Sequence, residues 1–259
     1  MPTLTEGSYA RPSSTVALVR DAGNGPQIFM VRRHADLSFG AAYAFPGGVL
    51  DAEDSEVDAF CRGLTDSDAN ERLGVEDLGL NYYSAAIREL FEEAGVLLAD
   101  VSCLDESLAS IRAGLNDGSS NWAEFVNQNS LSLHCDQLHY FAHWVTPPSQ
   151  ARRYSTRFFL AVMPDRQDAV HCGGELTDSR WTTASEILAA GRRGDLKLHY
   201  PTIKSLESIA RHATMESLVD WAKSCVQRGI TSMIPLLIER HGKQEIVLPG
   251  DKDYPGAKS

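Results

Sequence analysis

The glutamate-rich segment at residues 84–96 (SAAIRELFEEAGV) constrains the fold of this chain more than any other feature. At about 100° per residue, Glu89, Glu92 and Glu93 fall within one arc of a helix. The apolar positions fall on the opposite face: Ile87, Leu90, Phe91 and Ala94. We therefore expect three carboxylates to project from one side of a helix whose other side is anchored in a core.

The carboxylate cluster points to a bound cation. Like charges three or four positions apart weaken a helix by about 0.2–0.5 kcal/mol per pair. A hard ion such as Mg²⁺ or Mn²⁺, which prefers oxygen ligands, would remove this repulsion. The alternative interpretation is an acidic helix face exposed to water.

A turn with two adjacent glycines precedes this helix, within residues 44–54 (AFPGGVLDAED). Gly47 and Gly48 permit positive φ and allow the main chain to approach a ligand closely. We expect both glycines to lie against a substrate.

The order of these parts resembles the Nudix hydrolase box, whose second half reads Arg-Glu-aliphatic-any-Glu-Glu-any-Gly-aliphatic. Residues 88–96 match this half at every specified position. The usual box has a short spacer before the Arg, whereas here residues 55–83 separate Glu53 or Asp54 from Arg88. Such an interrupted box is similar to the coenzyme A diphosphatase branch, related to the peroxisomal enzyme. A second group of residues supports the same branch: residues 144–147, residues 152–159, Glu175 and Trp181.

The resemblance implies an α/β fold, the Nudix α/β/α sandwich with a mixed sheet, helical insertions and a C-terminal extension. We expect a flexible tail at residues 1–13, a Nudix domain at 14–213 with its insertion at 55–83, and a helix and hairpin at 214–259. Aliphatic and aromatic runs predict strands, and apolar stripes behind capping residues predict helices. The strands are expected at 15–20, 28–32, 96–98, 138–145, 157–163 and up to Trp181, and the helices at 83–94, 105–114, 121–128, 183–190, from Thr202 and at 218–226.

The resemblance also implies a metal-dependent cleavage of a pyrophosphate. Glu89, Glu92 and Glu93 would hold Mg²⁺ or Mn²⁺, and a water activated by the ion would attack phosphorus in line. Arg88 would orient Glu92 through an i,i+4 ion pair, although a plain surface pair gives the same pattern. Both Glu89 and Glu175 are candidates for the general base, and Glu53 or Asp54 would support the loop.

The expected substrate is a nucleoside diphosphate linked to another moiety, first of all coenzyme A or acyl-coenzyme A. Paired guanidinium groups bind phosphate well, so Arg152 and Arg153 are candidates for contacting its 3′-phosphate, and Arg33 is a further candidate for substrate contact. The alternative for all three arginines is exposure to solvent. ADP-ribose or a dinucleotide is the second choice of substrate, and a non-catalytic nucleotide-binding regulator is the third interpretation.

Charge and composition exclude other classes of function. The formal net charge of −11 argues against a general electrostatic grip on nucleic acid or an anionic membrane. The five cysteines form no C-x-x-C pair, which favours free thiols. No secretory signal and no apolar run of bilayer length is visible, so a cytoplasmic location is expected. The C-terminal hairpin makes a homodimer possible.

Overall fold

The central element is a mixed sheet with the strand order β8-β3-β2-β1-β6-β5-β9, to which β4 is added through β1 and β7 through β2. The computed structural model describes residues 9–33, 41–100, 107–173, 176–240 and 242–255. The strands of this sheet are β1 (Arg11–Asp21), β2 (Pro26–Arg33), β3 (Ala42–Ala44), β4 (Gly47–Val49), β5 (His139–Val145), β6 (Tyr154–Val162), β7 (Leu176–Thr182), β8 (Lys197–Leu198) and β9 (Ser232–Met233).

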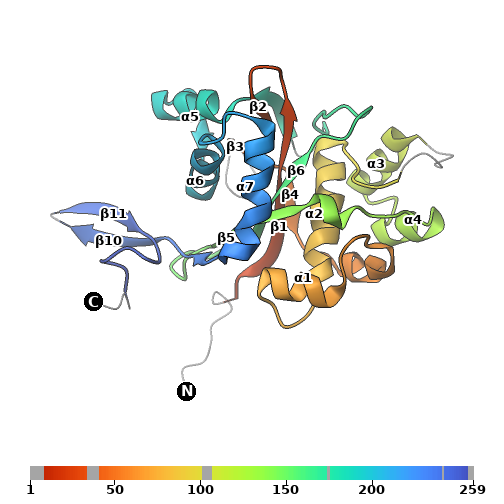
Figure 1. The fold of residues 1–259 in the computed structure, drawn as a ribbon, viewed down its shortest axis with the longest axis horizontal. Helices are drawn as coiled ribbons and strands as arrows, with labels where there is room; N and C mark the ends of the chain where they lie inside the picture. The colour runs from red at the N-terminus through yellow and green to blue at the C-terminus, as the bar shows by residue number, and fades with distance from the viewer. Residues whose placement is uncertain (1–8, 34–40, 101–106, 174–175, 241, 256–259) are drawn as a thin grey trace.

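Helices cover both faces of the sheet, as Figure 1 shows. One face carries η2 (Ala52–Phe60), α1 (Asp66–Leu73), α2 (Gly79–Ala94), α3 (Leu108–Asp117), α4 (Trp122–Gln128) and η3 (Cys135–Gln137). The other face carries α5 (Ala184–Arg193), α6 (Tyr200–Ile209) and α7 (Met215–Arg228). The predicted α/β/α sandwich with a mixed sheet is therefore confirmed.

Strand β1 organises the two hydrophobic cores. Val16 and Leu18 pack into the core below α2, whereas Ala17 and Val19 pack into the core below α5 to α7. A strand buried on both faces reads as a continuous apolar run, as this one does. The strand pairs in parallel with β6 and antiparallel with β2, which makes the sheet mixed.

The apolar face of helix α2 is buried, as the sequence predicts. The helix also ends at the predicted residue. Ile87, Leu90 and Phe91 are fully buried, and Gly95 closes the helix with φ of 73°. The helix begins at Gly79, however, before the predicted start at residue 83. The short helical pieces of the insertion at 55–83 predict a surface excursion with few apolar anchors, and this prediction is wrong. The segment contributes the first turn of α2 and many core side chains: Val57, Leu64, Ala69, Leu73, Leu80, Tyr82 and Tyr83.

Several other predicted elements differ in detail. Residues 96–98 are buried as predicted but form no strand, because only Ala99 makes an isolated bridge, to Leu133. Helix α6 begins at Tyr200 with His199 as its N-cap, so Thr202 lies inside the helix instead of capping it. Strand β1 begins at Arg11, within the predicted tail. Helix α3 begins at Leu108, and the expected residues 105 and 106 lie outside the described ranges.

The C-terminal part divides into a packed helix and a separate hairpin. Leu218 and Ala222 of α7 are fully buried in the same core as α6. The predicted hairpin is formed by β10 (Leu236–Arg240) and β11 (Lys243–Val247), and it projects from the body in Figure 1. Over the described ranges, all four cysteines are free and no helix combines the length and apolarity needed to cross a bilayer. Cys103 lies outside those ranges.

Candidate active site

The glycine turn is fixed against the sheet by strand pairing and by hydrogen bonds from two hydroxyl side chains. Strand β4 pairs antiparallel with β1, which places Gly47 opposite Thr15 and Gly48 opposite Ser14. The Thr15 hydroxyl donates to the carbonyl of Pro46 at 2.7 Å, and the Ser14 hydroxyl donates to the carbonyl of Tyr82 in α2 at 2.7 Å. These bonds bring the turn and the helix to the same edge of β1.

The two glycines approach the glutamates of α2 closely. The main-chain N–H of Gly47 donates to Oε2 of Glu93 at 2.8 Å. At Gly48, a Cβ atom would overlap the carboxylate of Glu89. The glycine pair predicted to lie at a ligand site therefore lies directly against two of the three predicted carboxylates.

Arg88 connects the two halves of the interrupted box. Its Nε donates to Oδ1 of Asp54 at 3.1 Å and its Nη2 donates to Oδ2 of the same residue at 3.0 Å. Nη2 also donates to the carbonyl of Val49 at 3.0 Å. On the other side, Nη1 lies 3.0 Å from Glu89 and 3.4 Å from Glu92. Arg88 therefore orients both glutamates, and the predicted i,i+4 pair with Glu92 is present.

The charge balance around Arg88 is negative. Burial alone lowers the pKa of the Arg88 guanidinium, but Asp54 and Glu89 more than offset this and raise it above its ordinary value. Burial raises the pKa of Glu92 to about 7; the positive charge of Arg88 opposes this rise and the negative charge of Glu89 adds to it. One guanidinium thus faces three carboxylates in a site shielded from water, and additional positive charge would be stabilised there.

The donor set fits a hard cation in type and charge. Glu89 and Glu92 share one nitrogen of Arg88, and Glu93 is 5 % exposed beside Gly47. Within the described ranges, no three acidic, His or Cys side chains converge into a closed metal cage. The carboxylates are instead held by Arg88 and by the main chain of the turn. They are gathered at one place on α2, and the role of Glu89, Glu92 and Glu93 as metal ligands stays a prediction.

Two acidic residues of the turn, left as alternatives by the sequence, have separate structural partners. Asp54 is fully buried and, besides Arg88, accepts a hydrogen bond from the Ser84 hydroxyl at 3.0 Å. Glu53 accepts from the main-chain N–H of Trp122 at 2.7 Å, at the start of α4. The Trp122 indole in turn donates to Ser84 at 3.1 Å. The sequence predicts Trp122 as a core contact of the helix at 121–128, and Trp122 is fully buried. It did not predict that Ser84 and Trp122 support the turn.

The predicted basic residues lie away from the carboxylates or outside the described part. Arg152 and Arg153 lie in the turn between β5 and β6, where Arg153 Nε donates to the carbonyl of Thr146 at 3.0 Å. The register places Tyr154 opposite Arg11 and Gly47 opposite Thr15, so Arg153 lies about 17 Å along the strand direction from Gly47. Their contact with a substrate stays a prediction. The side chain of Arg33 and the whole of Glu175 are outside the described residues.

The comparisons with known proteins agree with this architecture. A family model described as the NUDT19 Nudix domain matches residues 69–209. The human acyl-coenzyme A diphosphatase NUDT19 is 23% identical over 289 aligned residues, which cover 95% of this chain and 77% of that protein. The putative nudix hydrolase 7 of Caenorhabditis elegans is 25% identical over 237 aligned residues, which cover 88% of this chain and 70% of that protein. The crystal structure of a NUDIX hydrolase from Alicyclobacillus acidocaldarius matches with a TM-score of 0.68 and 27% identity, over 81% of this chain and 95% of that one.

Proposed function

Because the chain belongs to the NUDT19 Nudix domain family, and is thereby a hydrolase acting on phosphoric anhydrides, we propose that it cleaves the pyrophosphate of coenzyme A or an acyl-coenzyme A. The observation that carries this proposal is the closure of the box by Asp54 and Arg88, which gathers Glu89 and Glu92 beside the glycine turn. The products would be 3′-phosphoadenosine monophosphate and phosphopantetheine or its acyl ester.

The residues of the box divide the work between binding and orientation. Mg²⁺ or Mn²⁺, held by Glu89, Glu92 and Glu93, would neutralise the pyrophosphate and lower the pKa of an attacking water. Arg88 keeps Glu89 and Glu92 oriented toward the turn. Gly47 anchors Glu93 through its N–H, and the absence of a side chain at Gly48 leaves room for the Glu89 carboxylate. Glu89 and Glu175 are the proposed acceptors of the water proton.

The choice of substrate is supported by the human relative, an acyl-coenzyme A diphosphatase. We propose Arg152 and Arg153 as contacts of the 3′-phosphate, because paired guanidinium groups bind phosphate well, and Arg33 as a further substrate contact. If compounds with and without a 3′-phosphate are cleaved equally well, ADP-ribose or a dinucleotide becomes the favoured substrate. The role proposed for this arginine pair is then refuted.

Product analysis by mass spectrometry tests the proposal directly. The protein is incubated with Mg²⁺ or Mn²⁺ and with coenzyme A, an acyl-coenzyme A, ADP-ribose, NADH and diadenosine polyphosphates. Phosphopantetheine and 3′-phosphoadenosine monophosphate are the expected products, and chelation of the metal by EDTA should abolish their formation. Cleavage of another compound would keep the hydrolase chemistry and refute the coenzyme A assignment.

A charge-neutralising variant separates catalysis from nucleotide binding alone. Glu92→Gln should lower kcat by about 100-fold or more, because it removes one carboxylate from the site. Glu216→Gln, an exposed glutamate at the start of α7, is the matched control and should keep full activity. Equal activity of the two variants, with both folded, would contradict a catalytic role for the cluster on α2.

A further inference from the structure

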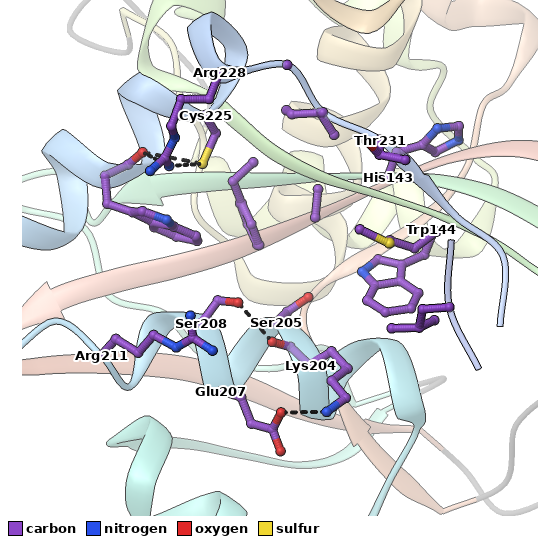
Figure 2. Close-up of a pocket in the computed structure, with 17 residues that line it drawn as sticks. His143, Trp144, Lys204, Ser205, Glu207, Ser208, Arg211, Cys225, Arg228 and Thr231 are labelled. Atoms are coloured by element: carbon purple, nitrogen blue, oxygen red, sulfur yellow. Dashed lines mark hydrogen bonds and ion pairs between the residues drawn. The ribbon is translucent and has the colours of Figure 1, made fainter. Parts of the chain in front are cut away.

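A cavity lies on the face of the sheet opposite α2. It encloses about 420 Å³ between β5, α6 and α7, and Figure 2 shows its walls. None of its lining residues belongs to α2 or to the glycine turn. The volume is within the range of about 300–1,000 Å³ that small-molecule sites occupy.

Two buried polar atoms of the lining have no hydrogen-bond partner. These atoms are Nε1 of Trp144 and Oγ of Ser205. The two residues are 7% and 3% exposed, so bulk solvent does not satisfy them. A buried donor or acceptor without a partner destabilises the protein. A ligand with an acceptor for the indole N–H, and with a donor or acceptor for the hydroxyl, would supply the missing partners.

The walls of the cavity are aromatic and suit a flat ring. Trp144 packs edge-on against Tyr200 with ring centroids 6.0 Å apart. Phe141 and Trp221, which also line the cavity, have ring centroids 5.4 Å apart and are tilted by 48°. A planar heterocycle uses such surfaces through stacking and edge contacts, which an alkyl chain cannot do.

The cavity carries positive charge at one end, although the chain as a whole has a net charge of −11. Arg211, which follows α6, and Arg228 of α7 lie on opposite walls at one end of the view in Figure 2, and Trp144 lies at the other end. Arg228 is held in its wall by its own helix, since Nη2 donates to the carbonyl of Trp221 at 3.4 Å and to Sγ of Cys225 at 3.1 Å. Lys204 also lines the cavity but is paired with Glu207 at 2.9 Å.

We propose that this cavity is a binding site for a nucleoside monophosphate. The base would lie between the aromatic walls, with a ring nitrogen accepting from Trp144 and a polar edge group pairing with Ser205. The phosphate would lie between Arg211 and Arg228, which can each donate two hydrogen bonds to it. A fatty carboxylate fits the charged end equally well but leaves Trp144 and Ser205 without partners. The site is independent of the pyrophosphatase assignment, because it uses no residue of the glutamate cluster.

The indole N–H resonances of the full-length protein provide a local readout. The chain has four tryptophans, and Trp144→Phe identifies the Trp144 signal by its loss while keeping an aromatic ring in the wall. Titration with adenosine 5′-monophosphate should move this signal downfield and saturate. Adenosine should bind about tenfold more weakly than the monophosphate, since it lacks the charged group.

Charge variants at the rim test the phosphate contact. Arg211→Gln and Arg228→Gln should each weaken binding of the monophosphate about tenfold. Lys223→Gln removes one charge from an exposed position of α7 outside the cavity and should leave the affinity unchanged. None of these variants should change pyrophosphate hydrolysis at low product concentration. If the wild-type protein hydrolyses no pyrophosphate but its Trp144 signal still shifts on titration, only the catalytic proposal is contradicted.

Three outcomes would overturn the inference. The first is a Trp144 signal that stays fixed while other signals respond, which places the nucleotide elsewhere. The second is equal binding of adenosine and adenosine 5′-monophosphate, which removes the role of Arg211 and Arg228. The third is a response to octanoate without a response to the monophosphate, which assigns the cavity to a different class of anion.

Discussion

Asp54 and Arg88 are 34 positions apart in the sequence and form a buried two-point hydrogen bond, at 3.1 Å and 3.0 Å, between the glycine turn and α2. Arg88 is 7% exposed and Asp54 is fully buried. The same guanidinium contacts Glu89 and Glu92 through its remaining nitrogen. Thus the residues that hold the turn in place also orient two carboxylates of the site.

The first prediction concerns this pair. Asp54→Asn keeps the shape of the side chain but removes its charge, so it leaves Arg88 buried with less compensation. We expect a loss of about 3 kcal/mol in the free energy of unfolding, measured by urea denaturation, together with a lower kcat. The exposed pair Arg193–Asp195 provides the control, and Asp195→Asn should cost less than about 1 kcal/mol. Similar losses for the two variants would contradict a structural role for the buried pair.

The second prediction uses the two adjacent glycines, which differ in what surrounds them. A Cβ at Gly47 would overlap the main chain of Ser14 and Thr15, and its φ of 155° disfavours other residues. A Cβ at Gly48 would meet the end of the Glu89 side chain, which can move. Gly47→Ala should therefore destabilise the protein by several kcal/mol, roughly as overpacking does. Gly48→Ala should cost little stability but lower kcat, because it displaces a carboxylate of the site.

Thermal unfolding and steady-state kinetics on the two variants measure this difference. A folded, fully active Gly48→Ala protein would show that the position of the Glu89 carboxylate is unimportant for turnover. A Gly47→Ala protein of normal stability would show that β4 can move away from β1. Each result contradicts one half of the prediction independently of the other.

The parts of the site that follow from helical periodicity within one segment could be predicted from the sequence. Helical spacing placed Glu89, Glu92 and Glu93 together, and the flanking glycine predicted the end of α2 correctly. The sequence left open whether Glu53 or Asp54 supports the loop, because both belong to one turn and only the packing of that turn decides which carboxylate points inward. It did not predict that Asp54 pairs with Arg88. The support from Ser84 and Trp122 depends on a contact between α2 and α4 that no local pattern encodes.

The fold was predicted well in its strands and less well in its connections. Aliphatic and aromatic runs mark β1, β2, β5 and β6 because the middle of each strand is buried. Residues 96–98 have the same apolar composition but pair with no strand of the described part, so they are buried without joining the sheet. The cavity between α6 and α7 was not anticipated, because Trp144, Ser205 and Arg228 come from separate elements and form no sequence motif.

The third prediction is a pH dependence of stability that arises from His143. This residue is 8% exposed, and its two ring nitrogens lie 2.7 Å from Ser232 Oγ and 2.8 Å from Ser155 Oγ. Burial, together with the charge of Arg157, lowers its pKa to about 4. In the unfolded chain the pKa returns to about 6.5. Between these values the unfolded state binds the additional proton, so this contribution to stability is complete above about pH 6.5 and is lost as the pH falls toward 4.

Urea denaturation across this pH range measures the effect. We expect the wild-type protein to lose about 3 kcal/mol from this residue between pH 6.5 and 4, and His143→Gln to lose correspondingly less. His134→Gln is the control, since His134 contacts Asp100 at the surface. Parallel curves for wild type and His143→Gln would show that His143 is not held neutral in the folded protein.

The fourth prediction concerns the hairpin of β10 and β11. Within the part of the chain that the structure describes, its strands pair only with each other, and an isolated two-stranded hairpin is marginally stable in water. Leu237 and Ile246 are directly paired and are 61% and 42% exposed. A second copy of the chain would cover this apolar pair, so we expect the wild-type protein to be a dimer by size-exclusion chromatography with light scattering.

The double variant Leu237→Ser with Ile246→Ser should be monomeric. The control double variant, Glu239→Ser with Gln244→Ser, changes an exposed polar pair on the same hairpin and should stay dimeric. A monomeric wild-type protein would contradict this role, and a dimer that persists in the double variant would place the interface elsewhere.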